Sequence, residues 1–203
     1  GGGIYFNKGN LEVNNNTKVI KNAAEFGGGI AIWGSDNGIA MIANTYLNQN
    51  YAKLLNVASS RGTGGGIGNM ANLKVYKTIV ENNTAVAFGG GIYNQYKISI
   101  INSTMIENEN EDDRFGQDIH NFGIEFFLIN SEIKPRKNTN ENVSHPNSIY
   151  GTKSGCAFDT CKTKGVGFND GGGECVANPN GIGLLCKKCS KGKFRSASSQ
   201  TPY

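Results

Sequence analysis

Residues 85–95 read AVAFGGGIYNQ and contain three consecutive glycines followed by an isoleucine. A glycine triplet loses much backbone entropy on folding and offers no side chain to bury. The same four letters, GGGI, begin at residues 1, 27, 64 and 89, and an altered copy, GQDI, begins at residue 116. Such repetition indicates a recurring geometric need, and we expect a repeated corner at Gly1, Gly27, Gly64, Gly89 and Gly116.

A second pattern recurs within each unit. It is an apolar pair two residues apart, a short gap, then Thr-x-aliphatic, and usually an asparagine. Alternation with a period of two indicates short strands with one buried face. The apolar pairs are Leu11/Val13, Ile39/Met41, Leu73/Val75 and Ile98/Ile100. The Thr-x-aliphatic positions are Thr17/Val19, Thr45/Leu47, Thr78/Val80, Thr104/Ile106 and Ser131/Ile133.

The spacing of the units predicts the fold class. Intervals of 26, 37, 25 and 27 residues between corners are typical of stacked supersecondary units. Three short strands per unit predict an all-β, right-handed parallel β-helix of about five coils. Leucine-rich repeats need a leucine where this chain has threonine, and propeller blades need about 40 residues. Equivalent side chains of a β-helix form ladders, expected here at Thr17, Thr45, Thr78, Thr104 and Ser131.

The repeat resembles a known family. Its GGGI copies match GG[AG][ILVY], and VIKN (19–22), LNQN (47–50) and VENN (80–83) match FxxN with an aliphatic residue in place of Phe. These paired motifs are similar to those of the polymorphic outer-membrane-protein repeats of autotransporter passengers and related β-helical adhesins. The resemblance covers about residues 1–135, and it implies surface display and adhesion without a defined chemistry.

All five cysteines lie between residues 156 and 189. Clustered cysteines in a short, loop-rich segment favour disulfides formed in an oxidising compartment. A zinc site is the alternative, although only one C-x2-C pair is present. The CKKCSKGKF segment (186–194) resembles the cysteine-rich modules of epidermal-growth-factor-like and ephrin-receptor-like proteins. The expected disulfide cysteines, one of them left over, are Cys156, Cys161, Cys175, Cys186 and Cys189.

These patterns divide the chain into three parts. We expect β-helix repeats over residues 1–135, a polar linker over 136–155, and a cysteine-rich module with a tail over 156–203. The formal charge of +4 is scattered, which disfavours nucleic-acid binding. No apolar run approaches the roughly 18 residues of a membrane span. A start inside a repeat, without signal peptide or initiator Met, predicts a processed chain or an excerpt of a longer one.

Four N-x-S/T sequons suit an extracellular chain that carries N-linked glycans and no other cofactor. Two of them, Asn15 and Asn102, follow the first strand pair of a unit. Asn82 follows the second pair, and Asn142 lies in the polar linker. We therefore expect all four asparagines to face solvent.

The hypothesis of a catalytic site depends on the segment NENEDDRFGQD (108–118), which is rich in acidic residues. Many β-helical proteins act on acidic polysaccharides and need clustered carboxylates. The candidate residues are Asp112, Asp113, Arg114, Asp118 and His120. A solvated acidic loop is the interpretation that we favour, so we predict no catalytic and no metal site.

Two further patterns have structural interpretations. GIGNMA (66–71) matches a dinucleotide fingerprint, but it begins inside a glycine triplet and no helical pattern follows it. Aromatic and aliphatic residues just after the triplets could bind sugars or a neighbouring subunit, but we expect them to complete strands. They are Tyr5, Ile32, Trp33 and Tyr93.

The sequence therefore predicts a non-catalytic, extracellular structural glycoprotein. An open first coil at GGGIYF would template further strands, so we expect subunits to self-assemble head to tail into a filament or surface coat. An alternative is a fragment of a cell-surface adhesin that displays loops such as 51–63 to glycans or cell-surface proteins. A polysaccharide-active enzyme is the third hypothesis.

Overall fold

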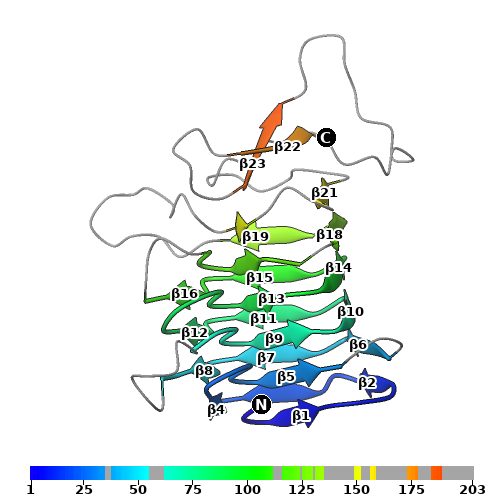
Figure 1. Ribbon diagram of the computed structural model, residues 1–203, viewed down its shortest axis with the longest axis vertical. Coiled ribbons are helices and arrows are strands. Elements are labelled where there is room, and N and C mark those ends of the chain that lie inside the picture. The colour runs from blue at the N-terminus through cyan, green and yellow to red at the C-terminus, as the bar shows by residue number, and fades with distance from the viewer. Residues whose placement is uncertain are drawn as a thin grey trace.

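The computed structural model is a parallel β-helix built from short strands (Figure 1). It describes residues 1–34, 38–54, 62–111, 116–123, 125–129 and 131–134, together with strands at 149–151, 156–158, 173–177 and 184–188. These residues form strands, turns and bends, and none of them belongs to a helix of the kind that crosses a membrane.

Four parallel sheets run along the stack, and each of the first four coils contributes one strand to each sheet. Sheet 1 contains β1 (Ile4–Phe6), β5 (Ile30–Trp33), β9 (Ile67–Met70), β13 (Ile92–Asn94), β17 (Ile119–Asn121) and β20 (Ile149–Gly151). Sheet 2 contains β2 (Leu11–Val13), β6 (Ile39–Ala43), β10 (Asn72–Tyr76), β14 (Lys97–Ile101), β18 (Glu125–Ile129) and β21 (Cys156–Phe158). Sheet 3 contains β3 (Lys18–Ile20), β7 (Tyr46–Asn48), β11 (Ile79–Glu81), β15 (Thr104–Ile106) and β19 (Glu132–Lys134). Sheet 4 contains β4 (Ala23–Ala24), β8 (Tyr51–Ala52), β12 (Thr84–Ala85) and β16 (Glu109–Asn110).

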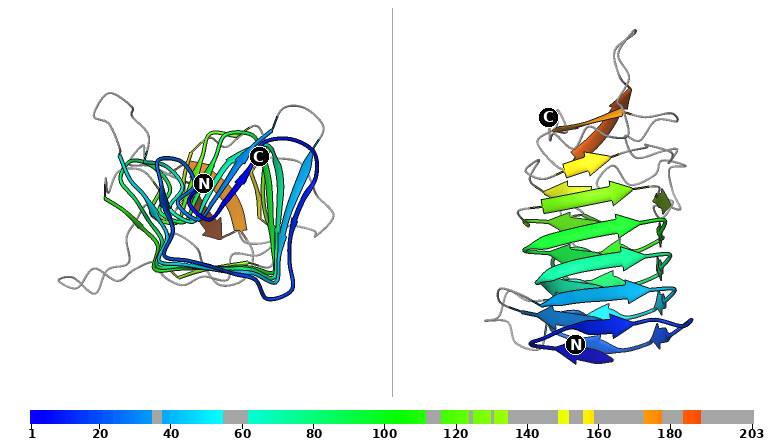
Figure 2. Two further views of the ribbon diagram at one scale, coloured as in Figure 1. Left: turned by 90° about the horizontal axis from the view of Figure 1, so that it is seen from below. Right: turned by 90° about the vertical axis from the view of Figure 1, so that its right-hand side faces the viewer.

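The parallel β-helix is thus confirmed, with two differences in detail. Each coil has four strands where we expected three, because the strands of sheet 4 are only two residues long and show no periodicity. Four coils contain all four strands, and β17, β18 and β19 begin a fifth. The coils superpose closely when viewed along the stack (Figure 2).

Strands from the C-terminal part of the chain also pair. β20 pairs with β17, and β21, which contains Cys156, pairs with β18. β22 (Gly173–Ala177) and β23 (Leu184–Lys188) form an antiparallel pair. Strands from the expected linker and cysteine-rich segments therefore extend sheets 1 and 2.

Aliphatic columns fill the interior of the helix. Sheet 1 contributes a column of isoleucines, Ile4, Ile30, Ile67, Ile92 and Ile119, which are paired from coil to coil. Sheets 2 and 3 contribute further columns, and together these side chains form one continuous core. Burial of this apolar surface is the main driving force for stacking the coils.

The register corrects one of the expected apolar pairs. Leu11 and Val13 pair with Ala40 and Ile42, so the expected pair Ile39/Met41 points away from the core. Ile42 is fully buried, whereas Ile39 is 53% exposed. A shift of one residue moves every side chain to the other face of a strand. The continuous apolar run IAMIA fits both registers, which explains the error.

The same shift affects one position of the threonine ladder. Thr104 pairs with Ile79 and Glu132 inside the strands of sheet 3, so Ser103 stands level with Thr78 and Ser131. Met105, in place of Ile106, is the buried core residue of this strand. Thr17, Thr45, Thr78 and Ser131 do precede their strands at equivalent positions.

Left-handed backbone conformations turn the chain at three corners of each coil. At the first corner, the leading glycine of the triplet has φ of 60° at Gly27, 69° at Gly64, 64° at Gly89 and 50° at Gly116. The second glycine allows close stacking, since a Cβ at Gly65 would lie 2.2 Å from the Gly90 carbonyl oxygen. This explains why the triplet recurs.

Non-glycine residues with positive φ occupy the other two corners. Between sheets 2 and 3 they are Asn15, Asn16, Asn44, Lys77 and Asn102, and between sheets 3 and 4 they are Lys21, Gln49, Asn82 and Glu107. The recurring asparagine that ends VIKN, LNQN and VENN does not adopt the left-handed conformation, whereas the residue before it does. The asparagine itself faces inward and bonds to its equivalents.

These inward asparagines, Asn22, Asn50, Asn83 and Asn108, form the corner ladder. The backbone N–H and the Nδ2 of Asn50 both donate to Asn83 Oδ1, at 3.0 and 2.8 Å. Asn83 donates in the same way to Asn108 Oδ1, and Asn22 to Asn50 Oδ1. Each side-chain oxygen thereby replaces the carbonyl partner that the turn removes from a buried N–H.

Removing one rung should be costly because it leaves buried donors without an acceptor. We expect Asn83→Ala to lower the free energy of unfolding by about 3 kcal/mol, measured by denaturant titration. Asn82→Gly is the matched control, since Asn82 is exposed with φ of 50° and glycine tolerates this conformation. Equal effects of the two substitutions would contradict the importance of the ladder.

Candidate functional site

The acidic segment considered for catalysis is only partly described, since Asp112, Asp113 and Arg114 lie outside the described residues. Asp118 is fully buried, and its Oδ1 accepts a hydrogen bond of 2.9 Å from Asn108 Nδ2. Its carboxylate thus receives the last donor of the corner ladder. This position differs from the solvated loop that we expected for the segment.

Gln117 and Asp118 stand where earlier coils have the second and third glycines of the triplet. Gln117 Oε1 accepts from the Asn110 backbone N–H at 2.7 Å, and its Nε2 donates to the Asn110 carbonyl at 3.2 Å. The Gln117 amide therefore hydrogen-bonds the N–H and the carbonyl of Asn110, which a further strand of sheet 4 would otherwise pair with. We call Gln117 and Asp118 the end cap.

His120, at the middle position of β17, packs among aromatic rings. Its ring lies 4.7 Å from that of Phe88 and 4.4 Å from that of Phe122, between ring centroids. The side chain is fully buried, and burial lowers the pKa of His120 from 6.5 to about 3. The imidazole is therefore neutral at physiological pH, and it contacts different groups from Asp118.

An outer aromatic cluster surrounds this histidine. It contains Phe26, Trp33, Phe88, Tyr93, His120 and Phe122, with neighbouring rings at edge-to-face, tilted or stacked angles. Gly68 makes room for Phe26, because a Cβ there would lie 2.7 Å from Phe26 Cε1. The GIGNMA segment thus has a packing role in sheet 1.

The four residues considered as a binding surface differ in burial and do not form one surface. Ile32 is fully buried in the core, and Tyr93 is 6% exposed in the aromatic cluster. Trp33 is half-buried against Phe26, with ring centroids 5.2 Å apart. Only Tyr5 projects into solvent, with 60% of its surface exposed.

Three of the four sequon asparagines lie at outer corners. Asn15, Asn82 and Asn102 are exposed and have φ of 61°, 50° and 50°. They are therefore sterically open to a glycan in the folded chain. Asn142 lies outside the described residues.

The cysteines are placed only in part. Cys156, Cys175 and Cys186 lie on β21, β22 and β23, while Cys161 and Cys189 fall outside the described residues. Within the described residues, no group of three or more His, Cys, Asp or Glu side chains is arranged around a metal position.

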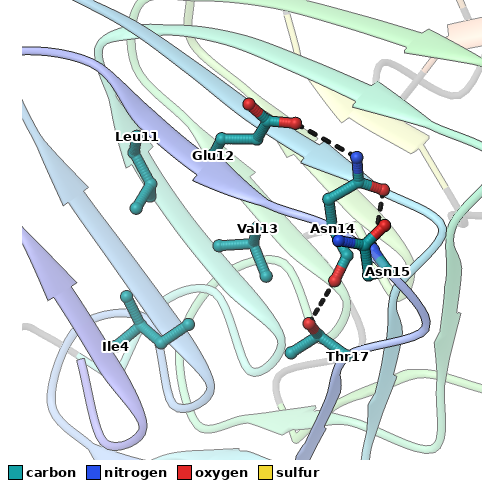
Figure 3. Close-up of a pocket in the computed structure, with 7 residues that line it drawn as sticks. All are labelled: Ile4, Leu11, Glu12, Val13, Asn14, Asn15 and Thr17. Carbon is teal, nitrogen blue, oxygen red and sulfur yellow. Dashed lines mark hydrogen bonds between the residues drawn. The ribbon is translucent and has the colours of Figure 1, made fainter.

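A hollow of about 600 Å³ lies at the first coil, and Figure 3 shows its lining. Ile4 and Leu11 pack against the core yet remain partly exposed, while Val13 is buried. Polar groups from the turn after β2 line the other side. The complete lining is Ile4, Leu11, Glu12, Val13, Asn14, Asn15 and Thr17.

Sequence reasoning missed a second set of buried asparagines at the third position of β9, β13 and β17, namely Asn69, Asn94 and Asn121. Asn69 Nδ2 donates to Asn94 Oδ1, and Asn94 Nδ2 to Asn121 Oδ1, each at 2.6 Å. All three are fully buried. The signal was present as GIGN, GIYN and DIHN, where an asparagine recurs two residues after the buried isoleucine.

Comparison with known proteins gives no match. No protein-family model matches the chain, and no curated protein and no solved structure is significantly similar to it. The likeness to autotransporter repeats and to epidermal-growth-factor-like modules therefore stays an expectation, while the parallel β-helix follows from the strand pairing itself.

The end cap makes a testable contribution to stability. We expect Asp118→Gly, which restores the repeat sequence, to lower the free energy of unfolding by about 2 kcal/mol, because Asn108 loses its acceptor. Asp118→Asn keeps an acceptor oxygen and should lose much less. Thermal and denaturant unfolding of the two variants would measure the difference, and a more stable glycine variant would contradict the capping role.

Burial of His120 predicts an acid-dependent loss of stability. The folded-state pKa of about 3 lies below the ordinary value of 6.5, so the unfolded state takes up the proton first as the pH falls. The free energy of unfolding therefore does not depend on this histidine's titration above pH 6.5. Between pH 6.5 and 3 it decreases by roughly 1.4 kcal/mol for each pH unit as the pH falls. Unfolding of His120→Phe at pH 7.5 and 4.5 should show a weaker pH dependence than the parent chain. Parallel curves would contradict this prediction.

Proposed function

We propose that the chain is a non-catalytic structural subunit of an extracellular glycoprotein assembly, extended end to end by strands of a second copy at the β1–β4 edge. One observation carries this proposal. All four sheets have an edge strand from the first coil, and residues of β1, of β2 and of the turn after β2 line the hollow at that edge.

The backbone of the edge favours strand addition. The first-coil strands each pair with one strand of the second coil and lie at one edge of their sheet, and they are β1, β2, β3 and β4. An edge strand presents N–H and C=O groups that template further pairing. A coil of the same sequence would bring strands of matching length and spacing.

Side chains at the edge favour a coil with the same repeat. Ile4 and Leu11 extend the aliphatic columns of the core to the hollow, so stacked aliphatic residues would bury apolar surface there. Asn22 donates to Asn50 Oδ1, which leaves its own oxygen at the open end of the corner ladder. An incoming asparagine would supply the donors that the other rungs receive.

Two observations support the non-catalytic, glycosylated character. Asp118 and His120, the described members of the candidate catalytic group, are buried in the end cap and the aromatic cluster. Asn15, Asn82 and Asn102 are exposed within N-x-S/T sequons. A rod with buried polar ladders and outward sequons suits a durable extracellular scaffold.

The experiment places a charge in the hollow. Leu11→Lys should block end-to-end stacking, because an inward charge at an edge opposes pairing. We expect the parent chain to form linear assemblies by light scattering coupled to gel filtration and by negative-stain electron microscopy, and the variant to remain monomeric.

Ile79→Lys is the matched control, since Ile79 is 40% exposed on the outer face of β11, away from the hollow. It should assemble like the parent chain. A parent chain that stays monomeric at high concentration, or equal assembly of all three proteins, would overturn end-to-end extension. Circular dichroism should show that Leu11→Lys is folded, so that a loss of assembly is not caused by unfolding.

A further inference from the structure

The register of the antiparallel pair β22–β23 sets two cysteines opposite each other. Cys175 is the direct partner of Cys186, flanked by Glu174 opposite Lys187 and by Val176 opposite Leu185. The residues between the strands, NPNGIG (178–183), have a composition typical of a turn. Sequence and register therefore agree on a hairpin with this cysteine pair in its middle.

We propose that Cys175 and Cys186 form a disulfide bond that cross-links this hairpin. Directly opposite residues of an antiparallel pair have Cα atoms about 4.5–5.5 Å apart. A disulfide requires a Cα separation of about 4.4–6.8 Å, so the backbone of the pair already fits. A cross-strand bond at this position needs no rearrangement of the two strands.

No other described cysteine competes for this pairing by register. Cys156 lies on β21 and pairs with Phe126 of the helix in a parallel sheet. The bond thus accounts for two of the five cysteines and leaves Cys156, Cys161 and Cys189 as an odd set. This cross-link forms whether or not the chain assembles end to end.

The chemistry is thiol–disulfide exchange. The two thiols lose two protons and two electrons as the S–S bond forms. The electrons pass to a donor disulfide, such as oxidised glutathione or the active-site disulfide of an oxidoreductase, which is reduced to two thiols. Such donors prevail in the oxidising compartments where secreted chains fold.

Peptide mapping tests the pairing directly on the full chain, folded from the reduced state in a glutathione redox buffer. Trypsin cuts after Lys164 and Lys187, which releases residues 165–187 with Cys175 and Cys186 as their only cysteines. After alkylation without reduction, we expect this peptide alone and unalkylated, with a mass lower than its reduced form by two hydrogen atoms.

Other outcomes would overturn the proposal. A peptide 165–187 linked to residues 154–162 or 189–191 would show a different connectivity, and a doubly alkylated peptide would show free thiols. Thiols that stay protected only while zinc is bound, and react after chelation, would favour the metal site.

Two variants sharpen the result. Cys175→Ser should expose one reactive thiol at Cys186, whereas Cys189→Ser should leave the mass of peptide 165–187 unchanged. The second variant is the matched control because it removes a cysteine of the same segment outside the proposed pair. Both measurements read the peptide itself, so a loss of stability in either variant would not obscure the pairing.

Discussion

The turns of this β-helix depend on backbone N–H groups that donate to side-chain oxygens of the next coil. Where the chain turns from sheet 2 to sheet 3 and from sheet 3 to sheet 4, a buried N–H loses the carbonyl that a straight strand would provide. In the corner ladder an asparagine Oδ1 of the next coil accepts that N–H, as Asn83 does for Asn50. At the preceding corner a hydroxyl does the same, since Thr78 N–H donates to Ser103 Oγ and Ser103 N–H to Ser131 Oγ. The coils stack tightly because these oxygens leave few buried donors unsatisfied.

This constraint also explains where the sequons occur. A corner needs a residue that tolerates a left-handed backbone, then an inward acceptor, then the first residue of a strand. Asparagine suits the first position, and threonine suits the last. Asn82-Asn83-Thr84 and Asn102-Ser103-Thr104 follow this order. The fold therefore generates N-x-S/T at its corners for structural reasons, and glycans at these sites would add to a role the asparagines already have.

The sequence predicted the architecture because its strongest signals are periodic. Glycine triplets and alternating aliphatic residues gave the coils, the corners and most of the core. Errors arose where two registers were equally apolar, as in IAMIA, and where Ser103 and Thr104 could both continue the threonine pattern. The end cap was the largest miss. Gln117 and Asp118 look like decay of the repeat, and only their contacts with Asn108 and Asn110 reveal a role.

The coils that precede the end cap share one repeat, so the β-helix could be lengthened by inserting a coil among them. Between Gly64 and Phe88 a whole coil contains the glycine corner, both buried asparagines and the threonine rung in the same order as its neighbours. Duplicating residues 64–88 at this point would add about 4.8 Å of rod and leave each ladder continuous. The same insertion after Gln117 and Asp118 would place a glycine corner against side chains that already occupy its space. The coils are thus interchangeable up to coil four, where Gln117 and Asp118 end sheet 4, while sheets 1, 2 and 3 continue into β17, β18 and β19.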